Sequence, residues 1–227
     1  MWLETVFSAG FILLTIVVSM KLFRSKIYNI AIVHLTSKWY KEVLALVDNN
    51  TKILDIGIGT GQALIKNKSV LIEKGITVEG VDYDLDYVNQ CRTHIKAEGL
   101  QHSITVCHKS ILDYNGGPYD AIYFSGSLMI LPDPVHALNH VKRMLSENGK
   151  IYVTQTIETN RSNVLRLMKP LLKYVLTIDF GNVTYEEDLL DAFKTTNLTV
   201  RLNKAICGTS IGDARSFRLF VLESIVS

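Results

Sequence analysis

The sequence predicts an α/β fold, with a seven-stranded mixed sheet that is mostly parallel, has an antiparallel last strand and is flanked by helices. One observation is the stretch 52–61, in which the apolar residues Ile53, Leu54 and Ile56 lead into glycines at alternate positions. This pattern is typical of a buried strand, a tight turn and a helix start, because glycine tolerates the turn's dihedrals and lets a ligand approach the backbone. The other observation is a series of short apolar runs that alternate with helical patterns along the rest of the chain.

The remaining elements follow in order from their own patterns. Residues 27–47 carry apolar side chains at helical spacing and are expected to form a helix ahead of the first strand. Further strands are expected at 77–82, 103–108, 119–124, 150–156, 198–206 and 216–224. Helices are expected at 64–74 and 85–98, each followed by a glycine that suits a C-cap, at 134–145, and at 184–193, where residues 184–187 have the pattern of a capping box.

The spacing of the glycines indicates which ligand the loop suits. Asp55, Gly57, Gly59 and Gly61 form the pattern Asp-x-Gly-x-Gly-x-Gly, whereas the dinucleotide fingerprint G-x-G-x-x-G needs a glycine where this chain has Gln62. An acid two residues before the first glycine can accept a hydrogen bond from a cationic amine, which S-adenosylmethionine (SAM) has and NAD lacks. A purely structural glycine turn in another α/β protein is the alternative.

A second acid, Asp82, ends the strand expected at 77–82, about 25 residues after the first glycine. This spacing suits one β-α-β unit and places the carboxylate where a ribose diol would cross the strand ends. Two hydroxyl groups that donate to one ionised acid make directional, charge-assisted hydrogen bonds. A helix cap is the ordinary role of a lone Asp at a strand end. Tyr83 follows and is able to lie on an adenine face, with a packed surface tyrosine as the alternative.

With the glycine loop and the two acids, residues 50–224 resemble the class I SAM-dependent methyltransferases, and the loop corresponds to their motif I. The resemblance implies a Rossmann-like sheet, in which the strands at 198–206 and 216–224 form an antiparallel hairpin, and SAM as the cofactor. The family often places an acid after the third strand, but here that stretch is Lys109-Ser110-Ile111, so the Ser110 hydroxyl or a backbone group is expected instead, with Asp113 as a fallback. The cofactor-binding residues that the resemblance implies are Asp55, Gly57, Gly59, Gly61, Asp82, Tyr83, Ser110, Ile111 and Ser125.

The stretch after the fourth strand narrows the resemblance. Residues 125–133 lack the Asn/Asp-Pro-Pro-Tyr loop of the methylases that act on nucleic-acid bases or glutamine. The chain is therefore more similar to the ubiquinone-methylase-like and small-molecule methyltransferases. Methyl transfer can rely on alignment and desolvation. His34, His108 and His136 are candidate bases, and no catalytic residue is assigned.

The N-terminus predicts a membrane anchor. Residues 5–20 carry no charge, and with Lys21 snorkelling the apolar segment extends to Phe23, long enough for a membrane-spanning helix. Lys21, Arg24 and Lys26 follow the span, so the positive-inside rule places the rest of the chain in the cytosol. A helix that lies in the interface or is buried in the protein is the alternative. The predicted organisation is an anchor with its basic flank at 1–26 and a methyltransferase domain at 27–227, with a leading helix at 27–48 and a substrate-side insertion at 159–182.

The amino-acid composition limits the kinds of partner that are expected to bind this protein. The chain has 24 Lys and Arg residues against 22 Asp and Glu residues, and this even balance argues against nucleic acid as a partner. Cys91, Cys107 and Cys207 are scattered without zinc spacing, so no metal is expected. The expected function is SAM-dependent methyl transfer to a lipophilic small molecule or lipid near the membrane. The alternatives are a protein methyltransferase and a catalytically weak, membrane-tethered SAM-binding interaction module.

Overall fold

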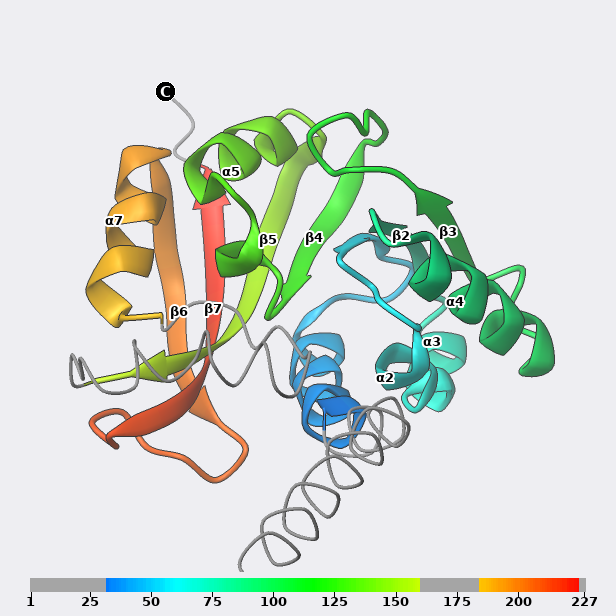
Figure 1. Cartoon of the computed structure of the whole chain (residues 1–227), viewed down its shortest axis with the longest axis horizontal. Coiled ribbons are helices and arrows are strands. Elements are labelled where there is room, and N and C mark those ends of the chain that lie inside the picture. The colour runs from blue at the N-terminus through cyan, green and yellow to red at the C-terminus, as the bar shows by residue number, and fades with distance from the viewer. Residues whose placement is uncertain (1–31, 160–183, 225–227) are drawn as a thin grey trace, which may run out of the picture.

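The predicted strands join one seven-stranded sheet in the order β3-β2-β1-β4-β5-β7-β6 (Figure 1). The structure is a computed structural model that describes residues 32–159 and 184–224. Neighbouring strands are parallel except at β7, which is antiparallel to both β5 and β6, as the sequence predicted. The strands are β1 (Lys52–Ile56), β2 (Thr77–Asp82), β3 (Ile104–His108), β4 (Tyr119–Ser125), β5 (Leu145–Glu158), β6 (Leu198–Ile206) and β7 (Arg215–Ser224).

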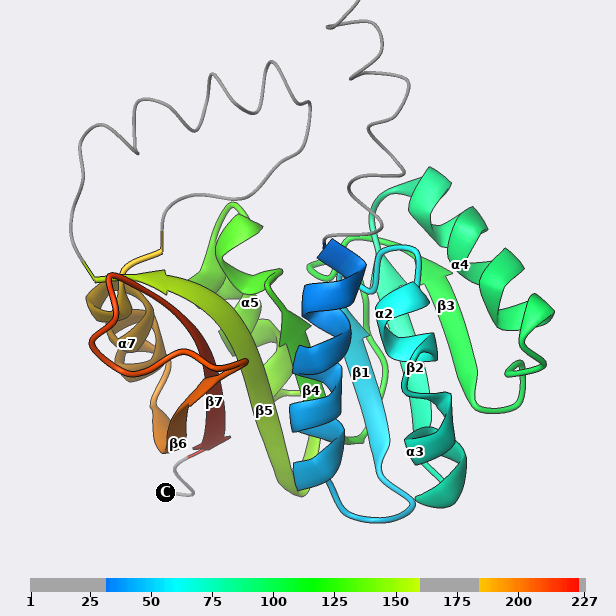
Figure 2. The same ribbon diagram turned by 90° about the horizontal axis from the view of Figure 1, so that it is seen from below.

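Helices cover both faces of the sheet (Figure 2). Residues 32–46 pack with α2, α3 and α4 against one face, and α5 and α7 pack against the other, so each face has its own apolar cluster. The bounds are α2 (Gln62–Ile65), α3 (Lys68–Glu73), α4 (Leu85–Ala97), the short 3₁₀ helix η1 (Leu128–Ile130), α5 (Pro134–Lys142) and α7 (Glu186–Thr195). Both faces are covered because parallel strands connected by helical crossovers are buried on each side.

The strand order reverses between β1 and β4. From β1 the chain adds β2 and β3 on one side of the sheet and β4 and β5 on the other. At such a switch point the connections leave the carboxyl ends of neighbouring strands in opposite directions, which opens a crevice where ligands bind in this class of sheet. The carboxyl ends of the parallel strands point toward the top of Figure 2. The glycine loop, which follows β1, lies at this edge.

The helix at 32–46 contacts the rest of the fold near its C-terminal end and in its middle. Near its C-terminal end, the Lys74 Nζ atom donates to the carbonyl oxygens of Leu44 and Val47, at 2.8 and 2.7 Å. These hydrogen bonds satisfy carbonyl groups that a helix end leaves without partners. In the middle of the helix, Trp39 lies near Gly126, the residue that follows β4. The helix therefore starts at the carboxyl edge of the sheet and runs away from it, as Figure 2 shows.

The single helix predicted at 64–74 is wrong, because the structure has two short helices separated at Asn67. The Asn67 side chain is 8% exposed and donates to the carbonyl oxygens of Ser37 and Ala63, both at 3.0 Å. An Asn side chain that bonds backbone groups offers the chain an alternative to helix continuation. The predicted helix at 134–145 also ends earlier, at Lys142, because Leu145 already belongs to β5. The glycine C-caps are confirmed, with φ of 62° at Gly75 and 67° at Gly99.

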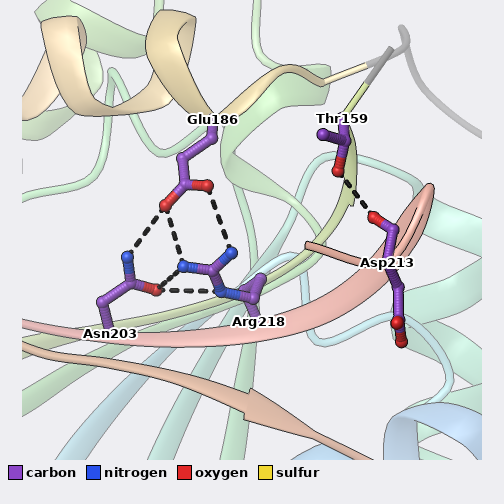
Figure 3. Close-up of polar contacts among 5 residues, drawn as sticks. All are labelled: Thr159, Glu186, Asn203, Asp213 and Arg218. Carbon is purple, nitrogen blue, oxygen red and sulfur yellow. Dashed lines mark hydrogen bonds and ion pairs between the residues drawn. The ribbon is translucent and has the colours of Figure 1, made fainter. Parts of the chain in front are cut away.

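The capping box predicted at 184–187 is also wrong. Tyr185 is the N-cap residue of α7, and its side chain makes no capping hydrogen bond. The Thr184 hydroxyl instead accepts from the Gln155 side chain at 3.1 Å. The Glu186 carboxylate is engaged by Arg218, as Figure 3 shows. Thr184 is therefore not the N-cap residue that a capping box needs, and its hydroxyl bonds a side chain of β5 instead.

Arg218, Glu186 and Asn203 form a polar cluster, here called the Arg218 cluster, that ties α7 to β6 and β7 (Figure 3). Arg218 is 1% exposed, and its guanidinium donates to both oxygens of Glu186, at 2.8 and 3.2 Å. Asn203 accepts from Arg218 Nε at 2.9 Å and donates to Glu186 at 2.9 Å. Burial alone would raise the pKa of Glu186, but the hydrogen bonds from Asn203 and Arg218 and the charge of Arg218 lower it. The buried cation is thus paired, as a stable interior requires.

The chain leaves β5 and returns to α7 at one place. The Glu158 N–H donates to the Thr184 carbonyl at 3.0 Å, and Glu158 forms a parallel bridge with Tyr185. On the other side, the Thr159 hydroxyl donates to the Asp213 carbonyl at 2.6 Å (Figure 3). Residues 158 and 185 are therefore neighbours in space. The insertion predicted at 159–182 lies, apart from Thr159, outside the described residues.

The membrane-spanning helix predicted at residues 5–23 also lies outside the described residues. Within 32–159 and 184–224, no helix is long and apolar enough to cross a membrane.

Candidate cofactor site

The loop after β1 has the backbone that its glycines predict. The φ angles of Gly57, Gly59 and Gly61 are 76°, 59° and 71°, all in the left-handed region that favours glycine. The Gly57 N–H donates to the Val81 carbonyl at 2.8 Å, so the loop begins while the chain is still bonded to β2. This hydrogen bond therefore holds the start of the loop against the carboxyl end of β2.

The three glycines differ in what surrounds them. A Cβ atom on Gly57 would lie 2.8 Å from the Ser127 Cβ atom, and one on Gly61 would lie 2.6 Å from the Cys91 sulfur. Both positions exclude a side chain because the protein itself is packed against them. A Cβ atom on Gly59 would meet no heavy atom of the described residues within 4 Å. Gly59 is thus the position where the loop leaves space for a ligand to approach the backbone.

Asp82 lies beside the loop, as its position in the sequence predicts. Its carboxylate accepts from the Gly59 N–H at 2.9 Å and from the Asp84 N–H at 3.0 Å, and the residue is 7% exposed. Burial raises the pKa of Asp82, although the backbone N–H groups of Asp84 and Gly59 oppose this. Each N–H occupies one lone pair on a different oxygen, so both oxygens keep a lone pair for further donors. This arrangement fits a ribose diol.

Asp55 is fully buried, and only one of its two carboxylate oxygens has a hydrogen-bond partner among the described residues. Its Oδ2 atom accepts from the Tyr40 hydroxyl at 2.7 Å, while Oδ1 has no hydrogen-bond partner among the described residues. Burial raises the pKa of Asp55 to about 7; the Tyr40 hydrogen bond opposes this shift and the nearby charge of Asp82 adds to it. A buried carboxylate oxygen without a donor is costly. The residue therefore suits a ligand that brings a cationic N–H group.

The other predicted site residues take different positions around the loop. Tyr83 is 76% exposed and is available to a ring ligand at the edge of the site. The Lys109 N–H donates to the Asp82 carbonyl at 3.0 Å, which brings Ser110 near Asp82. The Ser110 hydroxyl already accepts from the Leu112 N–H at 3.3 Å, so it has one lone pair fewer to offer.

Ile111 and Ser125 complete the predicted set. The Ile111 side chain is 3% exposed and belongs to the apolar core, so only its backbone groups are suited to a ligand. Ser125 is the last residue of β4 and is partly exposed at the switch point. Of the candidate bases, His34 and His136 are exposed, and His108 Nε2 lies 2.9 Å from the Tyr83 carbonyl, to which it donates. None of the three is given a catalytic role by its contacts.

Two contacts at the site were not predicted from the sequence. The hydrogen bond from the Tyr40 hydroxyl to Asp55 is one of them. Ser127, which packs on Gly57 and donates to the Ile56 carbonyl, was not considered. The register between β1 and β4 determines this second contact, because Ile56 pairs with Phe124 and brings the loop after β4 onto the glycine loop.

Replacing Asp82 by alanine is expected to weaken SAM binding by about 1.5–3 kcal/mol, because a charged acceptor for two hydroxyl groups is lost. Calorimetric titration of the folded variant measures this. Asp84→Ala is the matched control: Asp84 caps α4 by accepting from the backbone of Asp86 and Tyr87, so its loss should cost about 1 kcal/mol of stability and little affinity. Equal affinity losses in the two variants would contradict a ribose contact at Asp82.

The fold and the site together define a class of protein. A parallel sheet with a switch point, a glycine loop after its first strand and acids at the ends of β1 and β2 is the arrangement of α/β domains that bind a nucleoside-containing cofactor. The family model described as a methyltransferase domain matches residues 47–194, more than half of the chain. The chain belongs to this family of methyltransferase domains, and the family predicted from the sequence is confirmed.

Individual relatives are distant. The demethylmenaquinone methyltransferase of Bacillus cytotoxicus is 22% identical over 149 residues, which are 64% of this chain and 62% of that protein. The chain thus spans less than two thirds of that relative's length. The geranyl diphosphate C-methyltransferase of Streptomyces coelicolor, solved with Mg²⁺, geranyl diphosphate and S-adenosyl-L-homocysteine, is similar with a TM-score of 0.65 and 12% identity, over 85% of this chain and 78% of that one.

The fold is shared with a protein that is named for a different reaction. The [4+2]-cyclase SpnF is similar with a TM-score of 0.66 and 15% identity, over 86% of this chain and 82% of that one. At these identities the structural likeness shows the fold alone, and the predicted Rossmann-like sheet is confirmed. The reaction has to be argued from the site.

Proposed function

We propose that this protein is a SAM-dependent methyltransferase that acts on a lipophilic small molecule or lipid at a membrane. The observation that carries the proposal is the pair of acids at the glycine loop. Asp82 offers free lone pairs on both carboxylate oxygens beside Gly59, and Asp55 has a buried oxygen without a partner. A ribose diol and a cationic amine satisfy these two acids, and SAM carries both.

In this proposal the chain's own residues bind and align the cofactor. Asp82 holds the ribose, Gly59 leaves room for it, and Asp55 attracts the ammonium group. When bound, SAM supplies a methyl group on a positively charged sulfur for in-line transfer to a nucleophile. The residues of the loop fix the direction of approach and exclude water, and alignment of this kind accounts for much of the rate without a dedicated base.

The apolar character of the carboxyl edge supports a lipophilic acceptor. Large apolar side chains are exposed in the loops and helix ends at this edge, although the strands behind them are buried: they are Tyr83, Leu85 at the start of α4, Ile130 in η1, and Ile211. Two relatives are named for isoprenoid compounds, demethylmenaquinone and geranyl diphosphate. An acceptor with an extended apolar part is consistent with both observations.

The position of the helix at 32–46 supports placing the site beside the membrane. Its start lies at the carboxyl edge, on the side that carries the cofactor loop (Figure 2), and the apolar residues 5–23 precede this helix in the sequence. In the proposal these residues anchor the protein, and the basic residues after them keep the enzyme domain in the cytosol. An anchor at this edge would raise the local concentration of an acceptor that resides in the bilayer.

The test measures cofactor binding and methyl transfer separately. The full chain in detergent micelles is expected to bind SAM in the micromolar range and not to bind NADH. Incubation with methyl-labelled SAM and a membrane extract is expected to give a labelled product that partitions into organic solvent. A labelled polypeptide would instead favour a protein methyltransferase. SAM binding without any labelled product would favour the interaction module, and NADH binding without SAM binding would overturn the proposal.

A further inference from the structure

We propose that Tyr40 is a positioning residue for the cofactor's ammonium group, because its hydroxyl holds one oxygen of Asp55 and leaves the other oxygen for the ligand. This inference rests on the proposed function, since it names the part of SAM that the buried acid recognises. Tyr40 lies within the helix at 32–46, and Asp55 lies in β1, so the contact joins the leading helix to the motif that precedes the glycine loop.

The geometry gives the two oxygens of Asp55 different roles. The Tyr40 hydroxyl lies 2.7 Å from Oδ2, whereas Oδ1 is equally buried and has no partner among the described residues. Burial raises the pKa of Tyr40, so the hydroxyl keeps its proton and acts as the donor. With Oδ2 fixed, the carboxylate cannot rotate freely, and a ligand cation meets Oδ1 in one orientation.

Tyr40 is itself held in place. Its ring packs edge-on against the ring of Tyr123, with 5.0 Å between ring centroids and an angle of 87° between the planes. The Tyr123 hydroxyl in turn lies 2.8 Å from the Thr154 hydroxyl, and Thr154 is fully buried in β5. The tyrosine that orients Asp55 is therefore fixed by β4 and β5, the strands on the other side of the switch point.

The titratable groups that face Asp55 from the packed elements are few. Tyr40 comes from the leading helix, Asp82 from β2, Cys91 from α4 and Tyr123 from β4. None of these carries a positive charge, so among the described groups that face the acid only the Tyr40 hydrogen bond favours its ionised form. A ligand ammonium would add the missing positive charge. Binding of the ammonium is thus expected to be coupled to ionisation of Asp55.

The experiment compares two ligands that differ in the ammonium end. S-adenosylhomocysteine carries the amino-acid group, and 5′-methylthioadenosine lacks it but keeps the adenine and the ribose. For the full chain in micelles, we expect Tyr40→Phe to weaken S-adenosylhomocysteine about tenfold in calorimetric titrations and to change methylthioadenosine less than twofold. Tyr152→Phe is the matched control, because it removes the hydroxyl of another buried tyrosine, in β5, that takes no part in holding Tyr40 or Asp55, and it should leave the ratio of the two affinities unchanged.

The dependence on pH gives a second readout that does not need a variant. In the wild-type chain, S-adenosylhomocysteine should bind more tightly as the pH rises from 6 to 8, whereas methylthioadenosine should not. In Tyr40→Phe this rise should move to higher pH, because the hydrogen bond that favours the ionised acid is lost. Equal weakening of both ligands, or a pH dependence shared by both, would overturn the role of Tyr40. Failure of the wild type to bind either ligand would instead overturn the proposed function.

Discussion

Replacing Gly57 by valine is expected to abolish cofactor binding and to lower the free energy of unfolding by about 2–5 kcal/mol. The cause lies within the protein: a Cβ atom at this position would lie 2.8 Å from the Ser127 Cβ atom, and a β-branched residue resists a φ of 76°. Denaturant unfolding and calorimetric titration measure the two effects. A stable variant that retains affinity would mean that the loop rearranges freely and does not form the site.

The variant Gly59→Ala tests whether glycine is needed at this position for ligand binding and not only for the backbone conformation of the loop. Gly59 and Gly99 have similar φ angles, 59° and 67°, and neither added Cβ would meet a described atom within 4 Å. The backbone strain of an alanine is therefore about equal at the two positions, roughly 1 kcal/mol. Only Gly59 borders the cofactor site, so Gly59→Ala should lose affinity while Gly99→Ala should not. Equal affinities would place the ligand elsewhere.

Replacing Asp55 by asparagine is expected to abolish SAM binding and yet to stabilise the ligand-free protein at neutral pH. Burial raises the pKa of Asp55 to about 7 in the folded state, against about 3.9 in the unfolded chain. Between these values the folded state holds a proton that the unfolded state has lost, so stability falls as the pH rises through this window and is level above it. Three pKa units correspond to about 4 kcal/mol as an upper bound.

The measurement is the denaturant stability of the ligand-free protein at pH 5 and pH 8. The wild type should lose stability between these values, and Asp55→Asn should lose less, because its side chain does not titrate. Asp113→Asn is the control, since Asp113 is an exposed carboxylate outside the loop. If Asp55→Asn and wild type showed the same dependence on pH, the buried acid would not be the group that titrates in this range.

The features that could be predicted from the sequence are those that depend on a short local pattern of residues. The bounds of β2 and β6 agree with the prediction, because short apolar runs between turn residues are a local signal. The left-handed φ angles of the glycine loop were predicted for the same reason. The bond between Tyr40 and Asp55 was not predicted, since it depends on how the leading helix packs on the sheet. The packing of Ser127 on Gly57 was not predicted either, since it depends on the register between β1 and β4.

The wrong predictions have the same origin. Residues 64–74 read as one helix, but Asn67 uses its side chain to bond the Ser37 carbonyl on another helix. Residues 184–187 have the sequence of a capping box, but the Thr184 hydroxyl bonds the Gln155 side chain, and Tyr185 is the N-cap residue of α7. In each case a polar side chain with a local role available found a better partner far away in the sequence.

The neighbouring positions of Glu158 and Tyr185 have a consequence for how such an enzyme diverges. The cost of closing a loop rises only slowly with its length, so chain inserted between two adjacent points of a sheet changes in length and sequence at little expense to the fold. On the far side of this junction the Arg218 cluster holds α7, β6 and β7 together without using any residue of the glycine loop. The junction is therefore a place where selection can exchange one segment for another while the cofactor machinery is inherited unchanged.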